Sequence, residues 1–180
     1  MAHVANLLEV RVNRHDRKAW KAARTLDDLG ELVVRWLNRE IRETPSYKGP
    51  VEAETLPIIA ELTVMNRGGF ITENSQYGDD CPWGNAWVDG FATDQVLARM
   101  IDAAAGTPLV IAACDPFQHE HHRAEHLIRC LYREMTGWWT EACPNVPDIR
   151  ACWFVSVEDP QVGRNDLWGI LARALERGKS

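Results

Sequence analysis

The sequence predicts a single α/β domain whose mixed, largely parallel sheet of about five strands has helices on both faces. In the second half of the chain, apolar segments of strand length alternate with amphipathic segments of helix length, which is the pattern of successive βαβ units. The run from Pro108 to Cys114 is apolar throughout, which is typical of a strand buried on both faces. A length of 180 residues fits one domain, 1–180.

Residues 1–50 are expected to form a strand and a helical region packed on this domain. The segment from Leu7 to Asn13 alternates apolar and polar residues, as a half-buried strand does. Thr25, with Asp28 three residues later, predicts a capping box that opens a helix. The turn-rich segment 44–50 predicts a loop.

Apolar spacing and capping residues define the elements after residue 50. Gly68 and Gly69 end one helical pattern, and Thr93 and Asn165 are predicted N-caps of two others. The predicted elements are helices over 55–66, 93–105, 120–136 and 166–177, strands over 70–72, 86–92, 108–114 and 151–157, a loop over 73–85, and a frayed tail over 178–180.

The chain is acidic, with 26 acids against 20 bases and a formal net charge of −6. This balance argues against broad binding to nucleic acid or to anionic membranes, because attraction to phosphate needs a basic face. The basic run from Arg11 to Arg24 is interpreted as a solvated helix surface, with a phosphate-binding face as the alternative. The five cysteines lack CxxC spacing, and the longest apolar run is too short to span a bilayer. We therefore expect a cytoplasmic protein without a membrane partner.

The most informative feature is the polar segment from Asn66 to Gln76. Two consecutive glycines, Gly68 and Gly69, let the backbone turn sharply or approach a ligand closely. The residues that follow offer hydroxyl and amide groups within a short stretch, and these can recognise a polar small molecule by hydrogen bonds. The alternative is a helix C-terminus followed by an ordinary polar turn.

The strand ends define the rest of the candidate site, because ligands bind at the carboxyl ends of parallel strands. This rule brings polar groups from several strands to one edge of the sheet. We assign ligand recognition to Arg67, Thr72, Ser75, Gln76 and Arg164. We assign candidate catalytic roles to Asp115 and Asp159, with Asp115 as a general base.

Two further clusters carry alternative chemistry. His119, His122 and His126 lie at helical spacing and could present imidazoles to Zn²⁺, but the run is not HExxH and also fits a polar helix face. Cys114 followed by Asp115 could be a nucleophile beside an acid, with a buried strand cysteine as the default interpretation. We therefore assign no metal site and leave the cofactor open.

Residues 62–76 read LTVMNRGGFITENSQ. This run resembles the signature LNR-G-F-x-T-x-x-SQ of a domain family of unknown function found in actinobacteria and their phages. The sequence departs from the signature at Met65, where leucine is usual, and at Tyr77, where proline is expected. The resemblance implies that the polar segment is a family feature, and it supplies no reaction. Other similar segments are 29–37, 45–55, 88–91 and 159–168.

The first hypothesis for the function is binding of a nucleotide-like or other polar small metabolite through residues 66–76, with or without catalysis. The second is a non-enzymatic interaction factor, a phage or host accessory protein, that binds a protein partner through exposed tryptophans. Trp83, Trp138 and Trp139 are the candidates, because they lie in loop-like or element-end segments.

Overall fold

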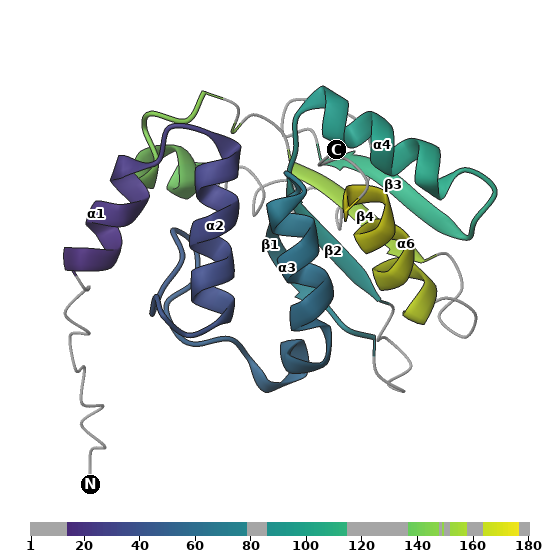
Figure 1. Ribbon diagram of the computed structural model, residues 1–180, viewed down its shortest axis with the longest axis horizontal. Helices are drawn as coiled ribbons and strands as arrows, with labels where there is room; N and C mark the ends of the chain where they lie inside the picture. The colour runs from purple at the N-terminus through teal and green to yellow at the C-terminus, as the bar shows by residue number, and fades with distance from the viewer. Residues whose placement is uncertain are drawn as a thin grey trace, which may run out of the picture.

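A computed structural model describes residues 14–78, 86–114, 137–147, 149, 152–157 and 164–176, and it shows helices layered on a β-sheet (Figure 1). Residues 137–142 are also helical. The other elements, in chain order, are α1 (Arg14–Ala22), α2 (Leu26–Leu37), the 3-10 helix η1 (Ala53–Ile58), α3 (Ile59–Arg67), β1 (Ile71–Gln76), β2 (Trp87–Phe91), α4 (Asp94–Ala104), β3 (Leu109–Cys114), β4 (Cys152–Val157) and α6 (Arg164–Glu176).

The sheet is antiparallel at every pairing, with the strands in the order β1-β2-β4-β3. The predicted largely parallel sheet of about five strands is therefore wrong, since the described residues form four strands. β2 and β3 do run in the same direction, as their connection through α4 suggests. However, β4 lies between them and runs the opposite way. A helical crossover fixes the relative direction of two strands without determining which strand separates them.

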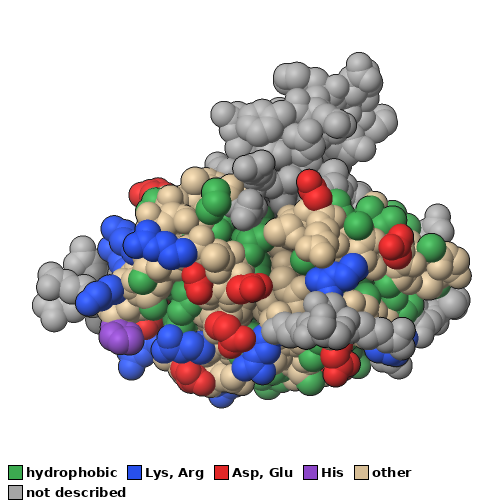
Figure 2. All heavy atoms as spheres, turned by 45° about the horizontal axis from the view of Figure 1, so that its top comes forward, with side chains coloured by type: hydrophobic (Ala, Val, Ile, Leu, Met, Phe, Trp, Pro, Cys, Tyr) green, Lys and Arg blue, Asp and Glu red, His purple; other side chains and the backbone are tan. Residues whose placement is uncertain are grey.

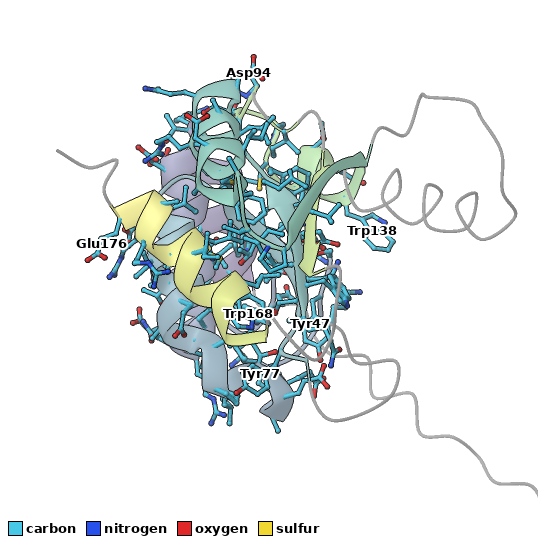
Figure 3. All side chains as sticks on the ribbon, turned by 90° about the vertical axis from the view of Figure 1, so that its right-hand side faces the viewer. Tyr47, Tyr77, Asp94, Trp138, Trp168 and Glu176 are labelled. Carbon is cyan, nitrogen blue, oxygen red and sulfur yellow. The ribbon has the colours of Figure 1, made fainter. Side chains whose placement is uncertain are left out.

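Helices α3, α4 and α6 lie on one face of the sheet (Figures 1 and 3). Trp138, from the helical residues 137–142, lies on the opposite side (Figure 3). The neighbouring Trp139 is fully buried and packs edge-on against Phe91 of β2, with ring centroids 5.6 Å apart, and against Trp20 of α1 at 5.5 Å. These aromatic contacts attach the N-terminal helix to the sheet through the side chain of Trp139.

The apolar strand β3 is less buried than its sequence predicts. It lies at the edge of the sheet, and the side chain of Val110 is 41% exposed. An apolar run over 108–114 was expected to be covered on both faces. The position of a strand within the sheet, which its own sequence does not specify, decides how much of each face is covered.

Two helices begin where the local sequence predicts, whereas α6 begins at Arg164, so the predicted cap Asn165 lies inside the helix. At the start of α2, Thr25 Oγ1 accepts a hydrogen bond from the Asp28 amide at 3.1 Å, and the Asp28 carboxylate accepts from the Thr25 amide at 3.0 Å. This confirms the predicted capping box. Thr93 likewise caps α4 by accepting from a first-turn amide at 3.3 Å. The helix predicted over 55–66 is instead η1 followed by α3, because Pro57 has no amide hydrogen for an α-helical bond.

Three predicted elements lie outside the described residues: the strand over 7–13, the helix over 120–136 and the tail over 178–180. Within the part of the chain that the structure describes, none of the helices is both long enough and apolar enough to cross a membrane.

Candidate ligand site at strand β1

The first half of the polar segment 66–76 is a rigid connection between α3 and β1. Asn66 is fully buried, and its Nδ2 donates to the carbonyl of Leu62 at 2.8 Å and to Thr72 Oγ1 at 2.7 Å. Its Oδ1 accepts from the Thr72 amide at 3.1 Å. Gly69 adopts a φ of 95°, a conformation that glycine accepts at little cost. Thr72, predicted to bind a ligand, is therefore occupied by a hydrogen bond within the fold.

Arg67 lies away from this connection. Its Nε donates to Glu31 Oε1 at 3.1 Å, and both side chains are about half exposed. The structure therefore does not bring Arg67 together with Thr72 and Ser75, which lie on β1 and line a cleft described below.

The second half of the segment, predicted as a loop from residue 73 onward, is strand as far as Gln76. The pairing of β1 with β2 is irregular between Thr72 and Ser75, which is the geometry of a β-bulge. The Asn74 amide donates to Asp89 Oδ1 at 2.8 Å, so a buried carboxylate takes the hydrogen bond that the bulge removes from the ladder. The polar residues that resembled a loop are accommodated in the strand by this bulge.

The same bulge holds Glu73 in an unusual environment. Glu73 as a residue is half-buried, but its Oε2 atom is fully buried and has no hydrogen-bond partner among the described residues. Burial is the main reason that the pKa of Glu73 rises to about 8, and the nearby charge of Asp89 adds to the shift. Hydrogen bonding with Ser46 and Trp139 opposes it. This carboxyl can therefore gain or lose a proton near neutral pH.

Glu73 lines a cleft of about 180 Å³ between β1, α2 and the segment 47–55. Two further acids, Glu52 and Glu54, stand on its rim, and both are exposed. Trp36 and Tyr47 form an aromatic wall. The lining residues include no lysine, arginine or histidine, so the cleft is negatively charged whenever its glutamates are ionised. Its hydroxyl groups come from Tyr47, Thr55, Thr72 and Ser75.

The aromatic wall is held in place by hydrogen bonds. Trp36 Nε1 donates to the carbonyl of Gly49 at 2.9 Å, and the Trp36 and Tyr47 rings meet edge-on at 5.9 Å. The Tyr47 hydroxyl donates to Glu52, and this hydrogen bond is the largest contribution to a raised Tyr47 pKa. These contacts fix the positions of the rings before any ligand binds, which reduces the ordering that binding requires.

The strand directions separate the other predicted site residues. β1 and β4 run in one direction, and β2 and β3 run in the opposite direction. The carboxyl ends of these two pairs of strands therefore lie on opposite sides of the sheet. Because neighbouring strands are antiparallel, their carboxyl ends do not meet on one side of the sheet, and the prediction of a single site there is wrong. Gln76 pairs with Trp87 at the end of β1 and does not line the cleft.

Several predicted residues cannot be placed, because they lie outside the described residues: Asp115, Asp159, Trp83, and the histidines 119, 122 and 126. Arg164 begins α6, and its side chain is likewise not described. Among the residues that are described, no group of three or more histidines, cysteines or acids is arranged to hold a metal ion.

Sequence reasoning missed Glu73, Trp36 and Tyr47 as site residues. They come from three separate segments, and no local spacing relates them. Trp36 lies in α2 and is only partly buried there. Its wall contact with Tyr47 follows from the path of the segment after α2, which periodicity does not predict.

The fold and the cleft together define a small protein with an antiparallel sheet and a candidate ligand site at its edge strand β1. The chain belongs to the family of a domain of unknown function (DUF6919), whose model matches residues 15–126. This confirms the resemblance to a domain family of unknown function. The matched region contains every residue that lines the cleft. No curated protein matches the chain.

Proposed function

We propose that the protein binds a small organic cation, an amine or a guanidinium compound, in the cleft at β1. The observation that carries this proposal is the buried Oε2 atom of Glu73, which lacks a hydrogen-bond partner among the described residues and borders the cleft. A buried carboxylate oxygen without a donor is costly, and an ammonium or guanidinium group supplies donors and opposite charge together.

The surroundings of Glu73 favour a cation over an anion. Glu52 and Glu54 add negative charge at the rim, and the lining includes no base that would hold a phosphate or carboxylate. The indole of Trp36 can contribute a cation–π interaction. The hydroxyl groups of Ser75 and Thr55 can accept or donate hydrogen bonds to polar parts of the ligand. A nucleotide phosphate suits this lining poorly, because the lining includes no lysine, arginine or histidine.

Binding of the cation is coupled to loss of a proton from Glu73. With a pKa of about 8, this carboxyl is mostly protonated at pH 7 in the free protein. A cationic ligand stabilises the carboxylate, so its binding releases a proton. The affinity is therefore expected to increase about tenfold for each pH unit up to pH 8, and to level off above that pH.

Binding of a cation in the cleft does not by itself require catalysis. Asp115 and Asp159 stay predictions as catalytic residues. Glu73 is a third carboxyl with a pKa in the range that suits a general base. It lies inside the cleft, where a ligand proton would be within reach.

Calorimetric titration with n-butylamine and methylguanidine, against n-butanol as the neutral analogue, tests this function. We expect both cations to bind and the alcohol not to bind. Glu73→Gln should weaken cation binding at least tenfold at pH 8, since it removes a charge-assisted contact. Asp102→Asn, which changes an exposed acid of α4 outside the cleft, is the matched control. Equal binding of amine and alcohol, or an unchanged affinity in Glu73→Gln, would contradict the proposal.

We propose a cytoplasmic location for this activity. Cys143 is buried and forms no disulfide with another described residue, which suits a reducing compartment. Burial also raises the pKa of its thiol to about 12, so the reactive thiolate is scarce at neutral pH.

A second candidate function, a non-enzymatic accessory factor that binds a protein partner, is supported by the 44% exposure of Trp138. Titration of Trp138→Ala and of the wild-type protein into an extract of the source cells, followed by size-exclusion chromatography, tests it. A partner that comigrates with the wild-type protein and is lost in the variant would support this function. Identical elution of the two proteins would contradict it.

A further inference from the structure

A second concave site lies beside α1, distinct from the cleft at β1. It is a groove of about 340 Å³, within the size range of small-molecule sites. Its lining comes from three segments: α1, residues 43–48, and the helical residues 137–142. None of its lining residues belongs to the acidic cleft.

The three walls of the groove are bonded to one another. Trp20 Nε1 of α1 donates to the carbonyl of Glu43 at 3.1 Å. Trp139 Nε1 donates to Ser46 Oγ at 3.2 Å, and Asn145 Nδ2 donates to the carbonyl of Lys21 at 3.0 Å. The groove therefore has a fixed shape and needs little ordering to accept a ligand.

Three bases line this groove. Arg17 and Lys21 are four residues apart on α1 and so share one side of that helix, while Lys48 enters from the 43–48 wall. None of the three forms an ion pair with another described residue. Figure 2 shows basic side chains gathered over the end of the molecule that carries α1. Three bases stand against two acids in the lining, and this small local excess of positive charge, in a chain with a net charge of −6, favours an anionic ligand.

An exposed aromatic ring accompanies the bases. Trp138 lines the groove, is 44% exposed, and lies on the side of the sheet away from α4 and α6 (Figure 3). An indole face next to cationic side chains suits a ligand that joins an aromatic ring to an anionic group. Two acids also line the groove, the buried Glu43 and the exposed Glu141. They can accept hydrogen bonds from hydroxyl or amino groups of such a ligand.

We propose that this groove binds a nucleoside phosphate, either free or at the end of a nucleic acid strand. Arg17, Lys21 and Lys48 contact the phosphate groups, and the base stacks on Trp138. Glu43 and Glu141 accept hydrogen bonds from the sugar or the base. The net acidic charge of the chain excludes a long nucleic acid tract as the main ligand, because such binding needs an extended basic surface.

Fluorescence anisotropy with a labelled ADP and with a labelled 5′-phosphorylated trinucleotide, both titrated with the full chain, tests the proposal. Adenosine and inorganic phosphate serve as competitors that each carry half of the recognition chemistry. Tighter binding of labelled ADP would indicate a free nucleotide as the ligand, and tighter binding of the trinucleotide would indicate the end of a nucleic acid strand. Binding of either probe would support recognition of a nucleoside phosphate. Each competitor should displace the probe far more weakly than unlabelled ADP.

Two single variants and a matched control complete the test. Lys21→Gln should weaken binding about tenfold by removing a phosphate contact. Trp138→Leu should weaken it at least fivefold by removing the stacking surface. Lys18→Gln changes an exposed base of α1 that does not line the groove, and should leave binding unchanged. All these side chains are exposed, and circular dichroism would verify that the variants are folded.

Three results would overturn the inference. The first is absence of binding to both probes, and the second is binding that Lys21→Gln and Trp138→Leu leave unaltered. The third is binding of an acidic peptide such as hexaglutamate in place of both probes, which would assign the groove to a protein partner. None of these results bears on the amine cleft, since the two sites share no lining residue.

Discussion

At the scale of single residues, the least expected feature is the Glu73 carboxyl, which is buried against Trp139 and near Asp89. It lies in a bulge where the Asp89 carboxylate accepts a hydrogen bond from the backbone amide of Asn74. An ionised Glu73 would place two carboxylates close together with little solvent between them. The fold therefore favours the protonated form of Glu73 at neutral pH. Ionisation of this carboxyl lowers the stability of the folded protein.

The pH dependence of stability follows from the raised pKa of Glu73. This residue places no penalty on folding below the unfolded-state pKa of 4.5, and the penalty grows as the pH rises to about 8. Glu73→Gln should therefore be close to neutral at pH 5. At pH 9 it should stabilise the protein by about 3 kcal/mol, since each pKa unit is worth about 1.4 kcal/mol and partial exposure screens some of the penalty. Urea unfolding at both pH values measures the difference. An equal effect of the variant at pH 5 and pH 9 would contradict this account.

The hydrogen bonds of Asn66 give a second prediction at the residue scale. Asn66→Ala removes three hydrogen bonds of a buried side chain and leaves the amide and hydroxyl of Thr72 without this partner, so it should destabilise the protein by about 3 kcal/mol. Asn145→Ala, which removes an exposed hydrogen bond to α1, should cost less than about 1 kcal/mol. Thermal and urea unfolding compare the two. Similar losses in both variants would show that the Asn66 contacts are not specially important.

At the scale of elements, the pairing of β1 with β2 positions the cleft. Gly90 of β2 faces β1 so closely that an added Cβ would lie 2.2 Å from the carbonyl oxygen of Ile71. The bulge in β1 and the glycine in β2 together set the separation of these strands. Any change in that separation would move Glu73 and Ser75 relative to the aromatic wall.

Gly90→Ala should therefore disturb both stability and binding. The backbone clash is expected to cost about 3 kcal/mol, at the upper end for overpacking. Amine binding should weaken even at temperatures where the variant is folded. Gly137→Ala, where an added Cβ has no neighbour within 4 Å, is the control and should change stability by less than about 0.5 kcal/mol. Differential scanning calorimetry of both variants measures this. Comparable stability of the two would contradict the close approach.

Local sequence predicts the starts of two helices, but it predicts neither the direction of β4 nor the strand character of residues 73–76. The capping box at Thr25 and the cap at Thr93 were predictable, because each depends on residues within one helical turn. The direction of β4 was not predictable, because an apolar run of six residues reads the same in either direction. The strand character of residues 73–76 was hidden for a different reason. Its polar side chains lie at a bulge whose Asn74 amide donates to Asp89, which is 15 residues further along the chain.

At the scale of the whole molecule, two sites of opposite charge flank the segment 43–49. Thr44 and Pro45 line the basic groove, whereas Tyr47 lines the acidic cleft. The formal net charge of −6 does not reveal this separation, because a net charge says nothing about where the charged residues lie. The polar segment 66–76 and the basic run near α1 are both evident in the sequence. The sequence could not predict which distant side chains meet each of them, because those contacts depend on tertiary packing.

If Glu73 exchanges its proton for a cationic ligand, the pKa of its side-chain carboxyl must fall when the cation binds. Carbon-13 NMR of labelled glutamate, assigned with Glu73→Gln, gives that pKa with and without n-butylamine. We predict a pKa of about 8 in the free protein and a decrease of at least one unit when the amine is bound. A pKa near 4.5 in the free protein, or a value that saturating amine leaves unchanged, would contradict the account.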